Sequence, residues 1–201
     1  MAYCTASALR AYLSDDMGLE HDDLLTDLIE RAQQVIDTQT GRTFEADADT
    51  TRYVDYAHVD GSTLYLDADL CSITSVVNNA DGGAAAETLE VDKDYIPLPR
   101  HETPYYAIKL LASSGRAWKY TNDPENAVSI TGRWAYSTTA PADVVQACIV
   151  LAGWMYRRRD AIGTDTDRPL ATGDGVVILD ASVPSLVKDV IRRYRRVPLW
   201  G

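Results

Sequence analysis

The sequence has few cysteines and no long apolar run. Cys4, Cys71 and Cys148 are far apart and odd in number, which excludes a disulfide framework and a C-x-x-C metal site and favours folding in a reducing compartment. We expect all three to be small, buried, apolar residues. The longest apolar run, 147–156, is interrupted by Gly153 and is shorter than the ~18 residues that span a bilayer, so we predict no membrane insertion.

Residues that carry catalysis or bind metals are also scarce. The three histidines, His21, His58 and His101, lie in unrelated contexts, and none is spaced at i, i+4 from another ligand, so no zinc site is predicted. No G-x-S-x-G signature supports a catalytic triad. The stretch TGDGVV is too short for a dinucleotide fingerprint, and DTDRPLATGD lacks the bidentate glutamate of a calcium loop. We therefore predict no enzymatic activity, no cofactor and no metal site.

Charge is abundant but unevenly distributed. The formal net charge is −11. Residues 1–140 hold 10 basic and 23 acidic residues, a net charge of −13, whereas residues 141–201 hold 9 and 7, a net charge of +2. The acidic part repels duplex DNA. Arginine outnumbers lysine by 15 to 4, and because the arginine fork suits carboxylates and interfaces, this bias indicates contacts with a partner.

Apolar spacing predicts helices at both ends of the chain. Residues 5–14 fit a short helix, and 22–40 fit a longer one that ends at Gly41. The longer helix carries one apolar stripe made of Leu24, Leu25, Leu28, Ile29, Ala32, Val35 and Ile36. After Pro141, a helix that is apolar around most of its circumference is predicted to be the central buried one. A last helix opens at Ser182–Pro184, with a stripe made of Leu186, Val187, Val190, Ile191 and Tyr194.

The middle of the chain has a different period. From about Thr51 to Tyr136, alternating runs and turn signals such as Asp60–Gly61 predict a meander of six or seven short strands, including one at RAWKY. The predicted fold class is α+β: a small bundle of about four helices, residues 1–48 and 138–201, with an antiparallel β subdomain, 49–137, inserted between the second and third helices. No internal repeat is detectable.

Between the last two helices lies a connection, 161–182, that is rich in glycine, threonine and aspartate. One short strand is predicted in it, at VVIL. Connections of this length in compact domains are usually functional, or mobile until a partner binds.

Two clusters hold seven of the nineteen basic residues. They are Arg157, Arg158 and Arg159 at the end of the third helix, and Arg192, Arg193, Arg195 and Arg196 at the end of the fourth. Interaction with the helix dipole, ~0.3–1 kcal/mol per cation, explains one or two arginines per helix. The excess favours an interface with a partner or a neighbouring subunit over helix capping, and both over nucleic-acid binding. The tail residues Leu199 and Trp200 are further candidates for that interface.

Five stretches, in this order, resemble the head–tail connector (adaptor) family of tailed bacteriophages and gene transfer agents. They are YCTASALRAYL, DDLLTDLIERAQQVIDTQTGRTF, TRYVDYAHVDGSTLYLDADLCSITSVVN, ITGRWAYSTTAPADVVQACIVLAGWMYRRRDAIG and VPSLVKDVIRRYRRV. The fourth is similar to the family's most recognisable segment, although Ala135 stands where the family often has glycine. The likeness covers nearly the whole chain.

The resemblance implies a structural virion protein, located in the neck of the particle after assembly in the host cytoplasm. Such a protein forms a twelve-subunit ring under the portal protein, extends the channel for DNA ejection and docks the tail or a stopper protein. Double-stranded DNA would pass its acidic surface without specific binding. Two alternatives stay open: a neck or tail-completion protein on the tail side of the joint, or a small DNA-binding module that regulates packaging.

Overall fold

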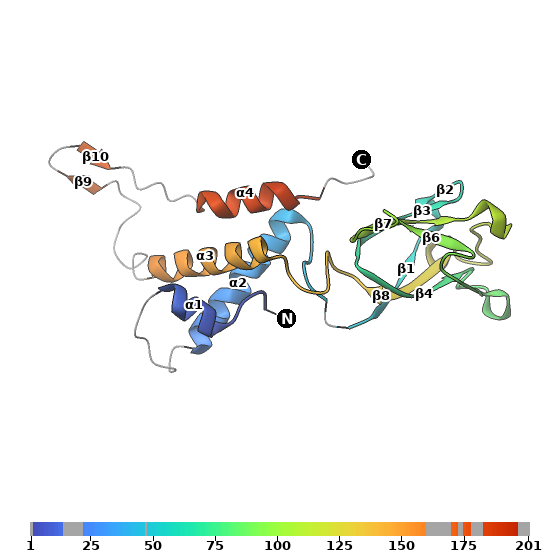
Figure 1. Ribbon diagram of the computed structural model, residues 1–201, viewed down its shortest axis with the longest axis horizontal. Helices are drawn as coiled ribbons and strands as arrows, with labels where there is room; N and C mark the ends of the chain where they lie inside the picture. Colours follow the sequence, from blue (N-terminus) through green and yellow to red (C-terminus); the bar gives the residue numbers. More distant parts are fainter. Residues whose placement is uncertain are drawn as a thin grey trace. The chain divides into compact units, whose positions relative to one another are not determined.

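The computed structural model describes residues 2–13, 22–46, 48–159, 170–172, 175–177 and 183–196. The chain divides into two compact units (Figure 1). The β unit is Arg42–Ala140, and the helical unit combines Ala2–Gly41 with the chain from Pro141 onward. The predicted α+β class is confirmed, because four helices are described and two antiparallel four-stranded sheets lie between the second and third of them.

The helices of the first half begin and end close to the predicted positions. Helix α1 spans Ala6–Leu13, and α2 spans Asp22–Thr40, as its apolar period predicts. Gly41 follows α2 with φ +66°, in the left-handed region that glycine adopts without a steric penalty. The predicted stripe of α2 is buried at Leu25, Leu28, Ile29, Ala32 and Ile36, and half-buried at Leu24 and Val35.

Helix α3, Ala142–Arg159, is the centre of the helical unit, as predicted. Helices α1, α2 and α4 all pack against it (Figure 1). Its buried residues include Val144, Ala147, Cys148, Leu151 and Ala152. These five lie along one stripe, and the apolar residues outside it, Val145, Ile149 and Val150, are half-buried, which is why the sequence of α3 shows so little polar periodicity.

Helix α4, Ser185–Tyr194, contacts α2 and α3. Val187 and Val190 of its predicted stripe are buried, but Leu186 is 43% exposed, so the prediction was wrong at that position. At 100° per residue, Leu186 lies at the margin of the stripe, beyond the strip of surface that the neighbouring helices cover.

The connection 161–182 lies mostly outside the described residues. Within it, strand β9, Leu170–Thr172, pairs antiparallel with β10, Gly175–Val177. The strand predicted at VVIL overlaps β10.

The β unit contains two sheets rather than a simple meander. One sheet has the order β1-β8-β4-β5, formed by Thr50–Val54, Val128–Arg133, Ser72–Asn78 and Glu87–Leu89. The other has the order β2-β3-β7-β6, formed by Val59–Asp60, Thr63–Leu70, Tyr105–Leu110 and Tyr95–Leu98. The hairpin predicted at Asp60–Gly61 joins β2 to β3. Strand β1 pairs instead with β8, so that Val54 lies opposite Val128.

Two strand predictions in this unit need correction. RAWKY forms no strand: it is irregular, and Trp118 within it is buried and donates its indole N–H to the Ser62 carbonyl at 3.0 Å. Strand β6 was not predicted, because Pro97 interrupts its pattern. Since β6 is an edge strand, proline is tolerated there.

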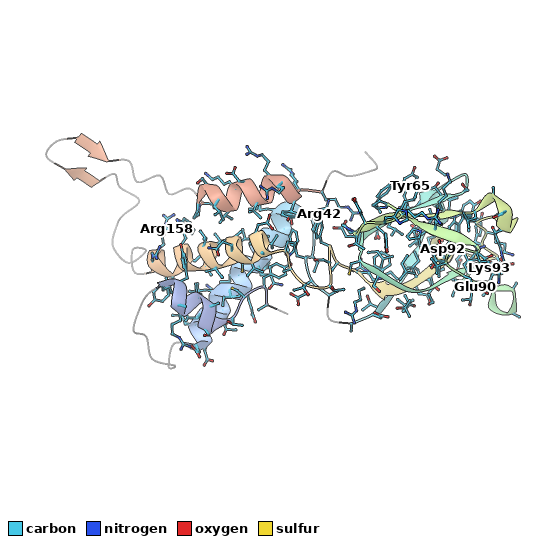
Figure 2. The ribbon with its side chains drawn as sticks, in the orientation of Figure 1. Arg42, Tyr65, Glu90, Asp92, Lys93 and Arg158 are labelled. Atoms are coloured by element: carbon cyan, nitrogen blue, oxygen red, sulfur yellow. The ribbon has the colours of Figure 1, made fainter. Side chains whose placement is uncertain are left out.

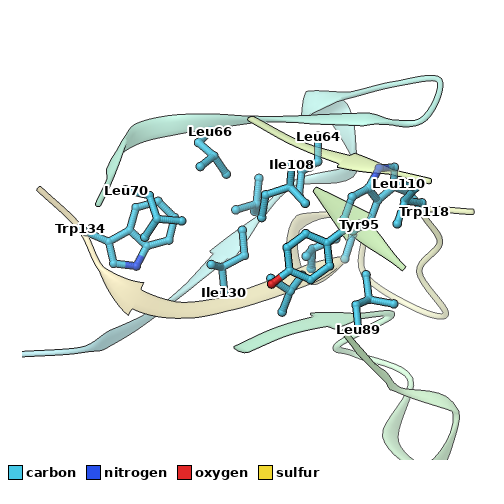
Figure 3. Packing of buried hydrophobic residues seen from close by; sticks show 14 residues of the cluster. Leu64, Leu66, Leu70, Leu89, Tyr95, Ile108, Leu110, Trp118, Ile130 and Trp134 are labelled. Atoms are coloured by element: carbon cyan, nitrogen blue, oxygen red, sulfur yellow. The ribbon is translucent and has the colours of Figure 1, made fainter. Parts of the chain in front are cut away.

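A single apolar cluster fills the space between the two sheets (Figure 3). The β1-β8-β4-β5 sheet contributes Val54, Val76, Leu89, Val128 and Ile130. The β2-β3-β7-β6 sheet contributes Leu64, Leu66, Leu70, Tyr95, Ile108 and Leu110. Trp118 and Trp134 complete it, and Trp134 donates its indole N–H to the Thr50 carbonyl at 3.1 Å. Both tryptophans thereby bury their rings without leaving an unpaired donor.

Candidate interaction surfaces

The first arginine cluster lies at the C-terminal end of α3 and contacts aromatic rings of its own unit. The Arg157 guanidinium carbon lies 5.5 Å from the Tyr12 ring centroid. The guanidinium carbon of Arg158, which is labelled in Figure 2, lies 4.8 Å from the Trp154 ring centroid. Cation–π contacts of this kind contribute about 0.5–1 kcal/mol at exposed sites. The side chain of Arg159 lies outside the described part of the chain.

The second cluster lies at the C-terminal end of α4 and is tied to the start of α3. Arg193 forms an ion pair with Asp143 at 2.9 Å, and the Tyr194 hydroxyl donates to the other oxygen of the same carboxylate at 2.9 Å. Arg192 pairs with Asp189 one turn earlier, also at 2.9 Å, and its side chain is 83% exposed. Each cation keeps most of its surface in water, so it stays available to a second carboxylate.

The chain after α4 is held at the C-terminal end of α2. The Arg196 N–H donates to the Thr40 carbonyl at 2.8 Å. Arg195 is exposed and has no ion pair with any of the described residues. Leu199 and Trp200, the other predicted interface residues, lie outside the described residues.

The structure places the two arginine clusters at opposite ends of α3. Asp143, which binds Arg193, lies in the first turn of α3, whereas Arg157 lies in its last turns. At 1.5 Å per residue, these ends are roughly 20 Å apart. The clusters therefore form two separate surfaces, of which the one on α4 also carries the exposed Leu186. From the sequence, their separation along one helix axis could not be read.

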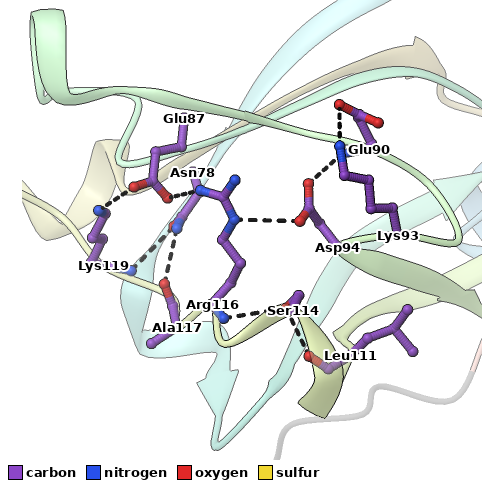
Figure 4. Close-up of polar contacts among 10 residues, drawn as sticks. All are labelled: Asn78, Glu87, Glu90, Lys93, Asp94, Leu111, Ser114, Arg116, Ala117 and Lys119. Carbon is purple, nitrogen blue, oxygen red and sulfur yellow. Dashed lines mark hydrogen bonds and ion pairs between the residues drawn. The ribbon is translucent and has the colours of Figure 1, made fainter.

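The β unit uses its cations internally. It holds 8 basic and 15 acidic residues, a net charge of −7. Arg116 pairs with Glu87 at 2.9 Å and with Asp94 at 3.3 Å, and Lys119 pairs with Glu87 at 2.6 Å (Figure 4). Outside this network, Arg42, Lys93, Arg100 and Arg133 each pair with a carboxylate of the unit. Few cations remain to bind phosphate, so an acidic surface results.

Carboxylates of this network have lowered pKa values. Hydrogen bonds from Lys119, and then Arg116, lower the pKa of Glu87. The Glu90 N–H, followed by the charge of Arg116, lowers the pKa of Asp94. In the turn that follows β4, the Asp81 carboxylate accepts hydrogen bonds from the backbone N–H groups of residues 121–123, and these lower its pKa. These acids stay ionised well below neutral pH and fix the irregular segments that follow β7.

Sequence reasoning missed an exposed aromatic pair on the β unit. Tyr56 and Tyr120 form an edge-on contact with ring centroids 5.0 Å apart, and they are 36% and 45% exposed. Tyr53 of the edge strand β1 is 58% exposed. Exposed tyrosines are typical of protein interfaces. No local signal brings residues 56 and 120 together, because the contact depends on the pairing of distant strands.

The described residues offer little for metal binding. Among them, no group of three or more His, Cys, Asp or Glu side chains could hold a metal ion. His58 and His101 belong to the β unit, and His21 lies outside the described part. None of the described helices is long and apolar enough to cross a membrane.

Comparison with known proteins gives the fold a counterpart. No family model matches the sequence, and no curated protein sequence matches it significantly. A chain in the neck of an empty gene transfer agent (GTA) particle with C6 symmetry matches with a TM-score of 0.62 and 19% identity, covering 99% of this chain and 92% of that chain. A chain in the virion of a native GTA particle matches with a TM-score of 0.56 and 18% identity, over the same shares of the two chains. This chain therefore has the fold of a GTA neck and virion component over nearly its whole length.

Proposed function

We propose that this chain is a structural protein of the neck of a gene transfer agent or tailed-phage particle, without enzymatic activity. The observation that carries the proposal is the likeness to a GTA neck chain, which extends over 99% of this chain and includes the β unit between α2 and α3. The five sequence stretches that resemble the connector family, in the same order, support it independently of the coordinates.

Within the neck, we place the chain as the head–tail adaptor that forms a ring under the portal protein. The related neck has C6 symmetry, and a ring of twelve copies contains that six-fold rotation. A head-to-tail ring needs two different, complementary surfaces on each subunit. The acidic β unit and the arginine surface of α4 have the required opposite charge.

The α4 arginines are also the proposed anchors on the portal. Arg192 and Arg193 keep 83% and 69% of their side chains exposed, although each already has a carboxylate partner. An arginine fork held in place by one carboxylate loses less rotamer entropy when it binds another. The Arg157–Arg159 surface and the Leu199–Trp200 tail are the remaining candidates for these contacts with the portal, the tail or a stopper protein.

Double-stranded DNA is proposed to pass the ring without specific binding. The β unit has a net charge of −7, and its ion pairs occupy most of its cations. Such a surface adds no attractive phosphate term, so DNA can slide during ejection.

The decisive experiment is electron microscopy of the purified chain mixed with a portal ring. We expect a second ring on one end of the portal for the wild type. A variant with Arg192, Arg193, Arg195 and Arg196 changed to Gln should keep its circular dichroism but lose docking. A matched control removes four exposed cations elsewhere, at Arg31, Lys93, Arg100 and Lys109, and should dock normally. Full docking of the α4 variant would contradict the anchor role.

The same preparation separates the alternatives. Binding to isolated tails but not to portals would favour a tail-completion protein on the tail side. Tight DNA binding at moderate salt, with a steep salt dependence, would favour a DNA-binding packaging module. The adaptor proposal predicts weak DNA binding that is lost by about 0.2 M salt.

A further inference from the structure

Two of the three cysteines meet inside the helical unit. The Sγ atoms of Cys4 and Cys148 lie 3.9 Å apart, both residues are buried, and 144 positions separate them in the sequence. The third cysteine, Cys71, is buried in the β unit, where its thiol donates to the Arg133 carbonyl at 3.4 Å. The three cysteines are thus one neighbouring pair and one separate thiol, an arrangement that their spacing in the sequence did not reveal.

The surroundings of the pair allow the two sulfurs to approach. Cys148 lies in the middle of α3, and its thiol also reaches the Ile29 carbonyl of α2 at 3.8 Å. Cys4 lies in the irregular segment before α1, which is held on α2 by Tyr3: its hydroxyl donates to Asp37 at 2.6 Å and its N–H to Gln33 at 3.2 Å. A disulfide requires a sulfur–sulfur distance of about 2.05 Å, so an approach of about 2 Å is needed. An irregular segment can make this movement while the central helix stays in place.

We propose that Cys4 and Cys148 are a site of intramolecular disulfide formation, with hydrogen peroxide as a sufficient oxidant. The bond would join the N-terminal segment to the central helix and close a loop that contains α1, α2 and the entire β unit. It would leave Cys71 as a free thiol.

The chemistry balances with one molecule of peroxide per bond. The Cys4 thiolate attacks one peroxide oxygen and the O–O bond breaks, which leaves a sulfenic acid on Cys4 and a hydroxide that takes up a proton to become water. The Cys148 sulfur then attacks the Cys4 sulfur, the S–O bond breaks, and the hydroxyl leaves as a second water with the Cys148 proton. Two thiols are oxidised and peroxide is reduced to two waters.

The order of the two steps follows from the setting of each sulfur. Cys4 is 7% exposed and Cys148 is fully buried, so a small oxidant reaches Cys4 first. The hydrogen-bond contact with Cys148 lowers the pKa of the Cys4 thiol, whereas that contact and burial raise the pKa of Cys148. Cys4 is therefore the attacking thiolate and Cys148 the resolving thiol.

The inference does not depend on the proposed function, but it matters if that function holds. A protein that folds in a reducing cytoplasm and then leaves the cell within a particle would change from the dithiol to the disulfide form. The bond would stabilise the helical unit at that moment, chiefly by restricting the unfolded chain.

The test uses the purified full-length chain, first reduced and then treated with a small excess of hydrogen peroxide under native conditions. We expect the number of free thiols to fall from three to one and the intact mass to fall by about 2 Da without added oxygen. Peptide mapping should recover a fragment that joins residues 4 and 148. Reduction should lower the midpoint of thermal unfolding by about 5 °C or more.

Three variants make the result specific. Cys71→Ser should form the bond as the wild type does, whereas Cys4→Ser and Cys148→Ser should show no loss of mass and no response to reduction. Because Cys148 lies in the core, Cys4→Ser is the decisive variant if Cys148→Ser does not fold. Three unchanged thiols, oxygen adducts without a cross-link, or a disulfide between two molecules would each overturn the proposal. None of these readouts involves a portal, so failure here is distinct from failure of the proposed function.

Discussion

The β unit and the helical unit are stabilised by different kinds of contact. In the β unit, two sheets share one apolar cluster, and ion pairs and backbone hydrogen bonds fix the irregular segments around it. In the helical unit, three helices pack on α3 mainly through apolar side chains, with a few polar links such as Arg193 to Asp143. We therefore expect the β unit to accommodate an added side-chain atom poorly, because its backbone segments are in direct contact. The helical unit should accommodate one better, because side chains at its surface can move.

The space around two glycines, one in each unit, illustrates this difference between the β unit and the helical unit. A Cβ at Gly132 of β8 would lie 2.1 Å from the Ser72 carbonyl oxygen, a backbone atom that the sheet holds in place. A Cβ at Gly153 of α3 would lie 2.8 Å from Cε1 of Tyr12, a side chain that is 36% exposed and can rotate away. The same substitution should thus be severe in one unit and mild in the other.

Gly132→Ala should have the largest effect of the changes considered. We expect a loss of about 3 kcal/mol in the stability of the β unit, because the β4–β8 pairing must open to admit the methyl group. Hydrogen exchange followed by mass spectrometry should show that, relative to the wild type, exchange becomes faster in peptides from 42–140 and changes less in peptides from α3. Ser129→Ala, on the same strand, is the matched control and should change little. Equal loss of protection in both units would contradict the separation proposed between them.

Acidification should lower the stability of the β unit relative to that of the helical unit. Glu87, Asp94 and Asp81 have lowered pKa values, so their contribution is present above their ordinary values of about 4 and is lost as the pH falls below them. Burial raises the pKa of Asp37 in the helical unit, so its ionisation is unfavourable near neutral pH and its protonation removes that penalty. Amide NMR spectra during urea titrations at about pH 6 and pH 3.5 should show the β unit losing stability relative to the helical unit.

Asp37→Asn is the control for that opposite trend. The amide oxygen can still accept the Tyr3 hydroxyl, whose distance to Asp37 is 2.6 Å, but it carries no charge. The variant should remove the pH dependence that Asp37 gives the helical unit and leave the β unit unchanged. A β unit that is as stable at pH 3.5 as at pH 6 would show that its ion pairs contribute nothing measurable.

Gly153→Ala should have a smaller effect, about 1 kcal/mol or less. The displaced Tyr12 ring loses packing, but alanine is favoured over glycine within a helix by roughly 1 kcal/mol. In a Tyr12→Ala background the clash is absent, so the same substitution should become stabilising. Thermal unfolding of the four proteins of this double-mutant cycle measures the coupling. A strong destabilisation in both backgrounds would mean that a backbone contact, not Tyr12, limits the space.

Arg192→Gln should have the smallest effect on stability, within about 0.5 kcal/mol. Its side chain is 83% exposed and that of its ion-pair partner Asp189 is 63% exposed. Ion pairs between exposed side chains contribute little to stability in water. Urea denaturation should give a midpoint close to that of the wild type. A loss of more than 1 kcal/mol would show that this arginine stabilises the fold and is not reserved for a partner.

Local signals predicted the helices better than the sheets. The period of Asp22–Thr40 and the glycine after it are properties of neighbouring residues, so the bounds of α2 could be predicted. The pairing of β1 with β8 joins residues some 80 positions apart, and no local pattern specifies it. The strand predicted at RAWKY is wrong for a related reason. The alternating pattern around Trp118 reflects the burial of its side chain and does not specify the conformation of the backbone.

The contacts of the candidate interface residues could be predicted only in part. The sequence identifies the arginine clusters, because their number exceeds what two helix ends require. It could not show that Asp143 binds Arg193 and Tyr194, since that contact depends on how α4 packs on α3. The contact between Cys4 and Cys148 was invisible for the same reason.

The two chain segments that join the β unit to the rest of the chain are fastened to each other. Tyr136 donates its N–H to the Thr43 carbonyl at 2.8 Å, Ser137 donates to the Phe44 carbonyl at 3.2 Å, and a β-bridge pairs Glu45 with Ser137. Entry and exit points held this close make the β unit a cassette in the genetic sense: it can be lengthened, shortened or exchanged between them with little added loop-closure entropy. The length of this insertion can therefore vary among chains of this fold while the helical unit around it keeps its connectivity.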